Sequence, residues 1–386
     1  DGEPVLPGAY GAEDGHEPVE PAELCVVGDA DQAIYAFRGA TIRNILEFER
    51  DYPDARTIML EQNYRSTQTI LSAANAVISR NEGRKPKNLW SDQGPGPKIV
   101  GFVADNEHDE AMFVAQEVDR LSDEEGVRPG DVAVFYRTNA ASRVFEEIFI
   151  RTGLPYRVVG GVRFYERKEV RDLLAYLRVL ANPADTVSLR RILNVPRRGI
   201  GERAEAMLEA FSARERVPFW EALRRAPEVP GLATRSINAI REFTELLEEL
   251  RRKELPVAEL AEEVLSRTGY RAELENSDDP QDESRLENLN ELIAVAQEFQ
   301  EANPDGTLVD FLEQVSLVAD ADQIPDDDGG QGVVTLMTLH TAKGLEFPVV
   351  FLTGMEDGVF PHLRSLGEPR ELEEERRLAY VGITRA

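Results

Sequence analysis

The sequence of 386 residues contains a single cysteine and no long apolar run. One cysteine, Cys25, cannot form an internal disulfide or build a cysteine metal site. It lies in the apolar run LCVV, so we expect a small buried core residue. No stretch approaches the 18 or so apolar residues of a membrane-spanning helix, and the first residues lack a secretory leader pattern. These absences favour a cytoplasmic protein with no membrane partner.

The sequence also lacks a Gly-Lys dipeptide, so the phosphate-binding loop GxxxxGK[ST] is absent. Lys343 precedes its glycine and cannot supply the loop lysine. No apolar strand before Leu24 leads into an acidic pair, and Asp109 and Glu110 lie in a helical stretch, where we expect solvated surface. We therefore assign no metal ligands in these residues.

The charge balance is acidic, with 44 Lys and Arg against 72 Asp and Glu and a formal net charge of -28. Taken alone, this charge argues against a nucleic-acid partner, because phosphate affinity comes from Lys and Arg. Binding in a groove depends on local charge, however, and basic residues do gather, for example within 190–198. Net charge therefore does not decide the partner.

Apolar segments alternate with helical patterns in the first part of the chain. After residues 1–22, which are rich in Gly, Pro and acids and are predicted to be loop or disordered, strands are predicted at 24–27, 55–60, 97–104 and 131–137. Helical spacing follows around 42–48, 70–78 and 111–121. This alternation predicts βαβ units and a parallel sheet.

The pattern changes between about Glu166 and Ser316, where amphipathic helices such as IREFTELLEELRRK dominate. Strands return at 333–339 and 348–354. We therefore predict an α/β fold whose single parallel sheet is interrupted by an inserted helical domain.

Four segments place polar side chains at turns where α/β proteins hold ligands. GDADQAIYAFRGA (28–40) carries Gln32, LEQNYRST (60–67) carries Arg65, LMTLHTAKGLEF (336–347) carries His340, and EEERRLAYVGITRA (373–386) carries Arg385. An arginine at such a turn suits a phosphate because its guanidinium is a fixed fork of donors. Each segment alone is weak evidence for a functional site. A lone Arg is more often a solvated surface charge, a lone His is more often a structural residue, and an Asp at a strand end can simply cap the turn.

In this order the four segments resemble motifs III, IV, V and VI of the UvrD, PcrA and Rep superfamily 1 DNA helicases. Intervening segments are similar too, among them GGVRFYERKEVRDLLAYL, VPRRGIGERAEAML and GMEDGVFP, so the resemblance runs from Leu24 to the last residue. It implies a RecA-like motor fold with an inserted α-helical domain. The implied division is 23–60 as a remnant of the first RecA-like domain, 61–160 and 331–386 as a truncated second one, and 161–330 as the insertion.

The resemblance also implies a set of nucleotide-binding residues. Gln32 matches the residue that senses the γ-phosphate, Tyr64 the ring that stacks on adenine, and Glu346 the acid that binds the ribose. Arg65 and Arg385 match the two arginines that approach the γ-phosphate, which makes Arg65, Arg385 and Gln32 the implied catalytic group. ATP and Mg²⁺ are the implied cofactors, with the metal held mostly by the preceding motor half, which these residues do not include.

A second implied set contacts DNA. Tyr35, Phe37 and Arg38 match residues that stack on or grip single-stranded bases, although Phe37 replaces a commoner tryptophan, which weakens stacking or leaves it a core residue. Arg137, Asn139 and His340 match positions near the DNA backbone. Gly199 and Gly201 could let backbone amides approach a duplex phosphate, or could simply form a turn between helices.

Together these expectations describe part of an ATP-dependent 3′ to 5′ DNA helicase of repair or replication. Its implied partners are single-stranded DNA, single-strand/duplex junctions, and repair or replication proteins. We expect these residues alone neither to hydrolyse ATP nor to unwind DNA. Two alternatives remain: a motor-less DNA- or protein-binding module, and a recombination helicase of the AddA or RecB kind, which ranks last because no nuclease cluster of acids is present.

Overall fold

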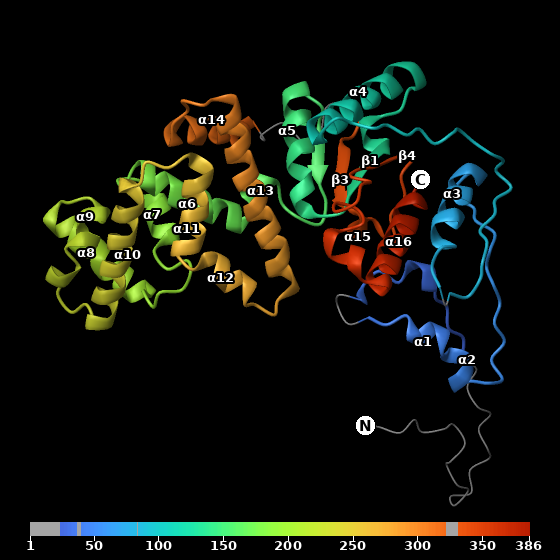
Figure 1. Ribbon diagram of the computed structural model, residues 1–386, viewed down its shortest axis with the longest axis horizontal. Helices are drawn as coiled ribbons and strands as arrows, with labels where there is room; N and C mark the ends of the chain where they lie inside the picture. Colours follow the sequence, from blue (N-terminus) through green and yellow to red (C-terminus); the bar gives the residue numbers. More distant parts are fainter. Residues whose placement is uncertain (1–23, 37–39, 83, 322–330) are drawn as a thin grey trace, which may run out of the picture.

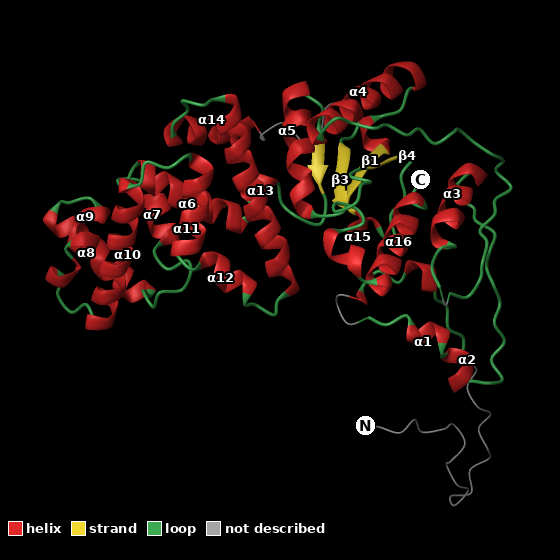
Figure 2. Cartoon of the chain, in the orientation of Figure 1, coloured by secondary structure: helices red, strands yellow, loops and turns green. Residues whose placement is uncertain are grey.

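A four-stranded parallel sheet organises one part of the molecule, and a group of helices forms the other (Figures 1 and 2). The structure is a computed structural model that describes residues 24–36, 40–82, 84–321 and 331–386. The strands are β1 (Val132–Tyr136), β2 (Tyr156–Val158), β3 (Val334–Thr338) and β4 (Val349–Leu352), in the order β2-β3-β1-β4. In β1, Val134 lies opposite Leu336 of β3 and Phe351 of β4. One sheet interrupted by a helical insertion is therefore confirmed.

Helices cover both faces of this sheet. All five residues of β1 are buried, although alternate residues point to opposite faces. Val134 and Tyr136 pack against α4 (Glu107–Glu125) and α5 (Ser142–Thr152). Ala133 and Phe135 pack on the other face against α15 (Leu339–Ala342) and α16 (Pro369–Ile383). Outside α16 lies α3 (Gln68–Ile78), whose Ile78 packs on Tyr380 (Figure 1). The result is a layered α/β part.

The helical part has one continuous apolar core, to which Tyr176, Phe211, Phe243 and Leu289 belong. Its helices carry apolar residues at helical spacing, as in α10, where Ile240, Phe243, Leu247 and Leu250 are buried. They are α6 (Lys168–Ala181), α7 (Thr186–Ile192), α8 (Glu202–Glu215), α9 (Phe219–Arg224), α10 (Thr234–Arg252), α11 (Val257–Arg267), α12 (Tyr270–Glu275), α13 (Pro280–Ala302) and α14 (Leu308–Ala321). The predicted change to helical structure is confirmed.

Short 3₁₀ turns connect several of these elements. They are η1 (Ala30–Gln32), η3 (Pro129–Asp131), η4 (Asn139–Ala141), η5 (Phe164–Glu166), η6 (Ala226–Glu228) and η7 (Leu363–Gly367). Of these turns, η4 packs on helix α13 and η7 on helix α16.

Helix α13 joins the two parts (Figure 1). Its apolar side, with Leu289, belongs to the helical core. Its acidic side faces α5, where the fully buried Arg143 pairs with Glu291 at 2.5 Å and Glu298 at 2.9 Å. This shared cation ties α13 to the sheet.

Three predicted strands are wrong. Residues 24–27, 55–60 and 97–104 are extended or irregular and lie outside the sheet, with Val27, Leu60 and Val103 exposed. An apolar run forms a strand only where another strand accepts its backbone hydrogen bonds, and none of the described strands pairs with these segments. For the same reason the prediction that Cys25 is buried is wrong, and this residue is exposed.

The predicted helices fare better. α3 and α4 are confirmed, while the stretch 42–48 contains α1 (Arg43–Leu46) and the start of a second short helix, α2 (Phe48–Asp51). The prediction that Glu110 is solvated surface is wrong, because its carboxylate accepts the Gly354 backbone N–H at 2.9 Å and burial raises its pKa. Within the described ranges, none of the helices has the length and apolar character needed to traverse a bilayer.

Candidate functional site

Arg65 and Arg385, from segments 320 positions apart, meet at Thr384. Arg65 Nη1 donates to the Thr384 carbonyl at 3.2 Å, and Arg385 Nη2 donates to the Thr384 hydroxyl at 3.1 Å. The structure therefore brings the two predicted γ-phosphate arginines to one place, where α3, the end of α16 and the segment before β4 come together.

Local hydrogen bonds explain how each arginine is held. The Asn63 side chain accepts the backbone N–H groups of Arg65 and Ser66, at 2.9 and 2.8 Å, and so shapes the turn that starts α3. Arg385 follows α16 directly, and its Nε donates to the Val381 carbonyl at 3.0 Å. The arginine at this helix end is 4% exposed, so the protein itself satisfies its donors.

The electrostatics of the pair favour an anion. Burial, and after it the Arg65 guanidinium, lower the pKa of Arg385, while Tyr380, Glu346 and Asp29 act in the opposite direction. Two neighbouring guanidinium groups repel each other, and this repulsion would be relieved by a ligand that carries spread negative charge.

Glu346 and Tyr64 flank the arginine pair. Glu346 accepts Arg65 Nε at 2.6 Å and has a side chain that is 67% exposed. The carboxylate predicted to bind a ribose thus holds Arg65 in this structure. Tyr64 is 74% exposed, and its hydroxyl donates to Gln62 Oε1 at 3.1 Å. Its ring therefore offers an open aromatic face beside Arg65.

Gln32 lies in the η1 turn and is tied to Asp29. Its Nε2 donates to Asp29 Oδ2 at 2.7 Å, and its backbone carbonyl accepts Lys343 Nζ at 2.9 Å. η1 packs on α16, the helix that leads to Arg385. The Asp29 carboxylate is also close enough to influence the pKa of Arg385, so Gln32 belongs to the same region.

Tyr35 and His340, predicted DNA contacts, lie side by side. Tyr35 hydroxyl donates to the His340 carbonyl at 3.3 Å, their ring centroids are 6.3 Å apart, and Lys343 Nζ lies 5.2 Å from the Tyr35 ring centroid. Phe37 and Arg38 lie outside the described residues.

Arg137 and Asn139 follow β1, at the same edge of the sheet as His340 after β3. Arg137 is already paired with the buried Glu375, with Nη2 to Oε1 at 2.8 Å. Asn139 Nδ2 donates to Ser284 of α13 at 3.4 Å. The structure thus gathers the predicted backbone contacts at the carboxyl ends of neighbouring strands, against the helical part.

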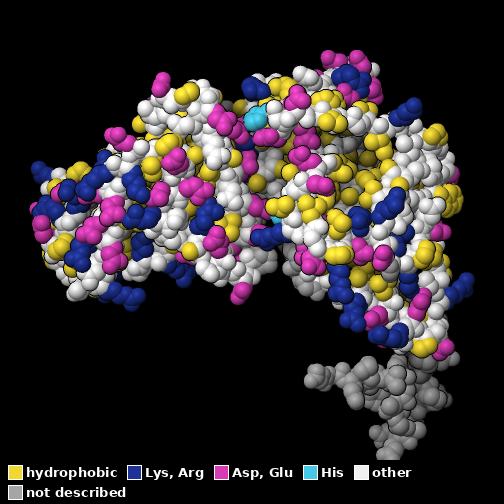
Figure 3. Space-filling model, viewed as in Figure 1, with side chains coloured by type: hydrophobic (Ala, Val, Ile, Leu, Met, Phe, Trp, Pro, Cys, Tyr) yellow, Lys and Arg dark blue, Asp and Glu magenta, His cyan; other side chains and the backbone are white. Residues whose placement is uncertain are grey.

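Gly199 and Gly201 lie far from this edge, in the helical part. Gly199 has φ +79°, a conformation that glycine adopts readily. Gly201 directly precedes α8, and no atom lies within 4 Å of a Cβ added there. The neighbouring Arg198 is occupied, because its Nη1 donates to the Ile192 and Val195 carbonyls at 3.0 Å. Figure 3 shows Lys and Arg side chains gathered, among acids, over the α8–α10 end of this part.

A metal ion does not fit these residues. No group of three or more His, Cys, Asp or Glu could hold one within the described ranges. Asp29 and Asp31 at η1 are each engaged by cations, since Asp29 pairs with Lys87 and Asp31 with Arg84 at 2.7 Å. These carboxylates are therefore not free to act as magnesium ligands.

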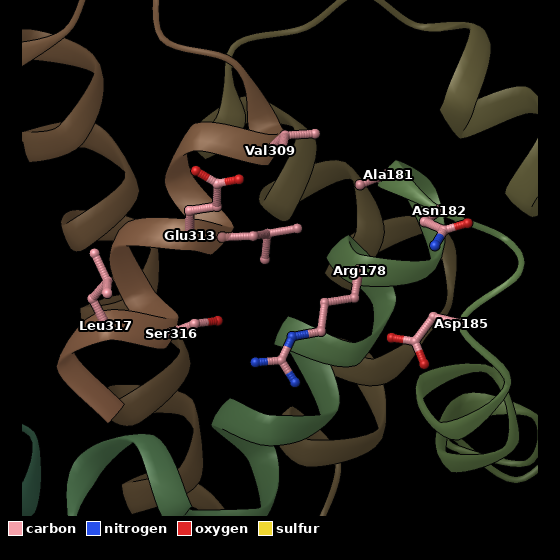
Figure 4. Close-up of a pocket in the computed structure, with 9 residues that line it drawn as sticks. Arg178, Ala181, Asn182, Asp185, Val309, Glu313, Ser316 and Leu317 are labelled. Atoms are coloured by element: carbon pink, nitrogen blue, oxygen red, sulfur yellow. The ribbon is translucent and has the colours of Figure 1, made fainter. Parts of the chain in front are cut away.

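A separate groove of about 500 Å³ lies between α6 and α14 in the helical part (Figure 4). It is lined by apolar residues such as Leu312 and Leu317, and Arg178 extends into it from α6 near Asp185. None of the predicted site residues lines this groove.

Sequence reasoning missed how the partners of the site are joined. Asp29 stood out beside Gln32 at a predicted strand end and Arg84 and Lys87 in a basic cluster, but their pairing with each other and the contact of Arg65 with Thr384 were not predicted. Their pairing depends on segments that meet only in the folded chain.

The fold defines the class of protein: a RecA-like parallel α/β domain interrupted by a helical insertion. The family model "UvrD-like helicase C-terminal domain" matches residues 58–386, and "UvrD/REP helicase N-terminal domain" matches residues 16–53. The chain belongs to the UvrD-like helicase family.

Its relatives include the ATP-dependent DNA helicase UvrD1 of Mycobacterium tuberculosis, 64% identical over 390 residues, which cover 97% of this chain and 50% of the relative. The ATP-dependent DNA helicase PcrA of Bacillus subtilis is 50% identical over 368 residues, covering 94% and 50%. PcrA of Staphylococcus aureus is 47% identical over 369 residues, covering 94% and 50%. The chain spans about half the length of these curated relatives.

Proposed function

We propose that this chain supplies one side of the ATP site and part of the DNA path of an ATP-dependent 3′ to 5′ DNA helicase. In this proposal residues 23–60 belong to the first RecA-like domain, 61–160 and 331–386 to the second, and 161–330 to the inserted domain. The convergence of Arg65 and Arg385 at Thr384 carries the proposal. The relatives are named as ATP-dependent DNA helicases, which supports it.

The chemistry assigned to the arginines is stabilisation of negative charge. As the γ-phosphoryl group transfers, charge spreads over its oxygens, and guanidinium forks donate to several oxygens at once. Arg65 would exchange Glu346, and Arg385 would exchange backbone carbonyls, for phosphate oxygens. Tyr64 offers its exposed ring to the base, and Glu346, once released from Arg65, can accept hydrogen bonds from ribose hydroxyls.

The DNA path in this proposal follows the carboxyl edge of the sheet. Arg137, Asn139 and His340 lie there, and Tyr35 is next to His340, with Phe37 and Arg38 assigned to the same path from sequence. Contacts of this kind to phosphate and base faces give affinity with little sequence preference. Gly199 and Gly201 would approach duplex phosphates at the basic end of the helical part.

The site is tested by ATP turnover in the full-length protein that contains this chain. Arg65→Ala and Arg385→Ala should each lower kcat by roughly 10³- to 10⁵-fold, the usual effect of such arginines, with a smaller effect on ATP binding. Arg120→Ala is the matched control, because Arg120 is an exposed arginine of α4 that pairs with Glu117, Glu124 and Glu125 of its own helix.

A variant that retains near-normal kcat while the control also does would reassign that arginine to a structural role. Residues 1–386 alone should show no helicase-like ATP turnover, because they lack GxxxxGK[ST]. Steady turnover by this chain would contradict the division of labour proposed here.

A further inference from the structure

The η1 turn, which carries Gln32, is surrounded by cations from three other segments. Lys343 Nζ donates to the Gln32 carbonyl at 2.9 Å, and Arg377 of α16 donates to the Ala33 carbonyl at 3.0 Å. Arg84 and Lys87 engage the carboxylates of the same turn. These four cations hold the η1 turn, whose Asp31 is buried, in a defined position.

Asp29 fixes the orientation of the Gln32 side chain. An ionised carboxylate only accepts hydrogen bonds, so the atom that faces it must be the amide nitrogen of Gln32, at 2.7 Å. The carbonyl oxygen Oε1 then remains as the atom that Gln32 can offer to a ligand. That atom is an acceptor, which suits a donor such as water and not a phosphate oxygen.

Lys87 fixes the position of Asp29 through an ion pair. Its side chain is 13% exposed, and its ammonium pairs with Asp29 and lies 3.4 Å from Asp31. The ammonium also lies 5.5 Å from the ring centroid of Tyr380, a buried residue of α16. Lys87 therefore connects the η1 turn to α16, the helix that leads to Arg385.

Arg84 anchors the segment that carries Lys87. Its Nε and Nη2 donate to the two Asp31 oxygens at 3.0 and 2.7 Å, and its Nη2 also donates to the Lys87 carbonyl at 3.2 Å. The hydrogen bond to Asp31 raises the pKa of Arg84, so this cation persists at any working pH. A bidentate pair with low exposure places Lys87 reproducibly over Asp29.

We propose that Lys87 is a positioning residue that acts through Asp29 to present the Gln32 carbonyl oxygen to the water that attacks ATP. This inference rests on the proposed function. In the reaction the water oxygen bonds to the γ-phosphorus, the bond from that phosphorus to the bridging oxygen breaks, and ADP leaves with the electron pair. One proton of the water stays on the phosphate formed, and the other passes to solvent.

Removing Lys87 leaves Asp29 without its cation in a partly buried position. A carboxylate that has lost its cation there turns toward solvent, and this movement releases the Gln32 amide. The amide can then rotate, so the acceptor is no longer held in place. Misplacement of a catalytic group by an ångström costs up to about 100-fold in rate.

The experiment measures kcat and KM for ATP in the full-length protein. Lys87→Met and Asp29→Asn should each lower kcat by about 10- to 100-fold with little change in KM, and Lys87→Arg should restore most of the loss. Lys85→Met is the matched control, because Lys85 lies in the same basic segment but pairs with Glu49, a residue outside η1, at 2.8 Å. Its kcat should stay at the wild-type value.

A double-mutant cycle separates positioning from a general structural effect. If Lys87 acts through Gln32, adding Lys87→Met to Gln32→Ala should lower kcat no further. Additive losses of kcat in the double mutant would overturn this inference but not the proposed function. Wild-type kcat in Lys87→Met and Asp29→Asn, with an impaired Gln32→Ala, would do the same. Wild-type kcat in Gln32→Ala would overturn the proposed role of Gln32 and this inference together. Thermal unfolding of each variant shows whether its loss of kcat comes from misfolding. If Lys87→Met does not fold, the kcat values of Lys87→Arg and Asp29→Asn decide whether the inference holds.

Discussion

The helical part and the sheet part of this chain differ in the size of their apolar cores and in what joins their segments. The helical part shares one apolar core that runs from Phe164 to Val315. The sheet part has smaller apolar clusters, and buried ion pairs connect its separate segments, as in Arg84 with Asp31 and Arg137 with Glu375. Regions stabilised mainly by burial tolerate changes of charge, whereas regions joined by ion pairs depend on both partners.

The difference matches the work proposed for each part. The residues assigned to ATP come from η1, the turn before α3, the segment before β4 and the end of α16, and ion pairs and charge-assisted hydrogen bonds join these segments. Such contacts can exchange partners when a charged ligand arrives, and an apolar core cannot. The helical part offers a stable body that carries Gly199 and Gly201.

The largest effect expected from this comparison is loss of the helical core. Phe243→Ala removes a ring that is 1% exposed, and we expect a destabilisation of about 3–5 kcal/mol in this chain. Hydrogen exchange should show lost protection in α6–α14 before β1 and β3. Val187→Ala, at an 82% exposed residue, should cost less than about 0.5 kcal/mol. Equal loss of protection in both parts would mean that they do not form separate cores.

A smaller effect is expected from breaking an ion pair in the sheet part. Arg84→Met leaves the buried Asp31 without its bidentate partner, and we expect a cost of about 1–3 kcal/mol in urea unfolding. Arg43→Met, which removes an exposed i,i+4 pair with Glu47, should leave the urea unfolding midpoint close to that of the wild type, because solvent screens this pair. Similar values for both variants would remove the ion pairs as the distinguishing feature of the sheet part.

The smallest effects should appear in DNA binding by the full-length protein, and they should differ between the parts. Arg137→Ala and His340→Ala should weaken single-strand binding at low salt, with the salt slope for Arg137→Ala reduced by about 1. Gly201→Ala should leave single-strand affinity unchanged and weaken junction binding, because an added methyl group blocks close approach of the backbone. Unchanged affinity in both Arg137→Ala and His340→Ala would remove them from the DNA path.

Much of the fold could be predicted from the sequence. Periodicity identified β1, β3, β4 and the helical insertion, because the apolar residues of these elements pack in a hydrophobic core of the folded chain. The strands predicted at 24–27, 55–60 and 97–104 are not formed. An apolar run indicates a tendency to be buried, but it does not show that a partner strand is present. The three-residue β2 was missed, since so short a strand has no periodicity.

The candidate site, like the fold, could be predicted only in part. The family resemblance of the motif segments implied that Arg65, Gln32 and Arg385 belong to one region, and in the structure η1 and α3 both pack on α16, the helix that leads to Arg385. The partners of these residues could not be predicted, because Arg84 with Asp31 and Arg65 with Glu346 join positions far apart in the sequence. Their complementarity becomes visible only when the chain is folded.

The central claim, that two distant arginines serve one nucleotide, is tested most directly by a crystal structure of the full-length protein with a non-hydrolysable ATP analogue. We predict that the guanidinium groups of Arg65 and Arg385 both lie within hydrogen-bonding distance of the γ-phosphate, with Glu346 released from Arg65. A γ-phosphate held entirely by other residues, with both arginines still bonded to Thr384, would contradict the account.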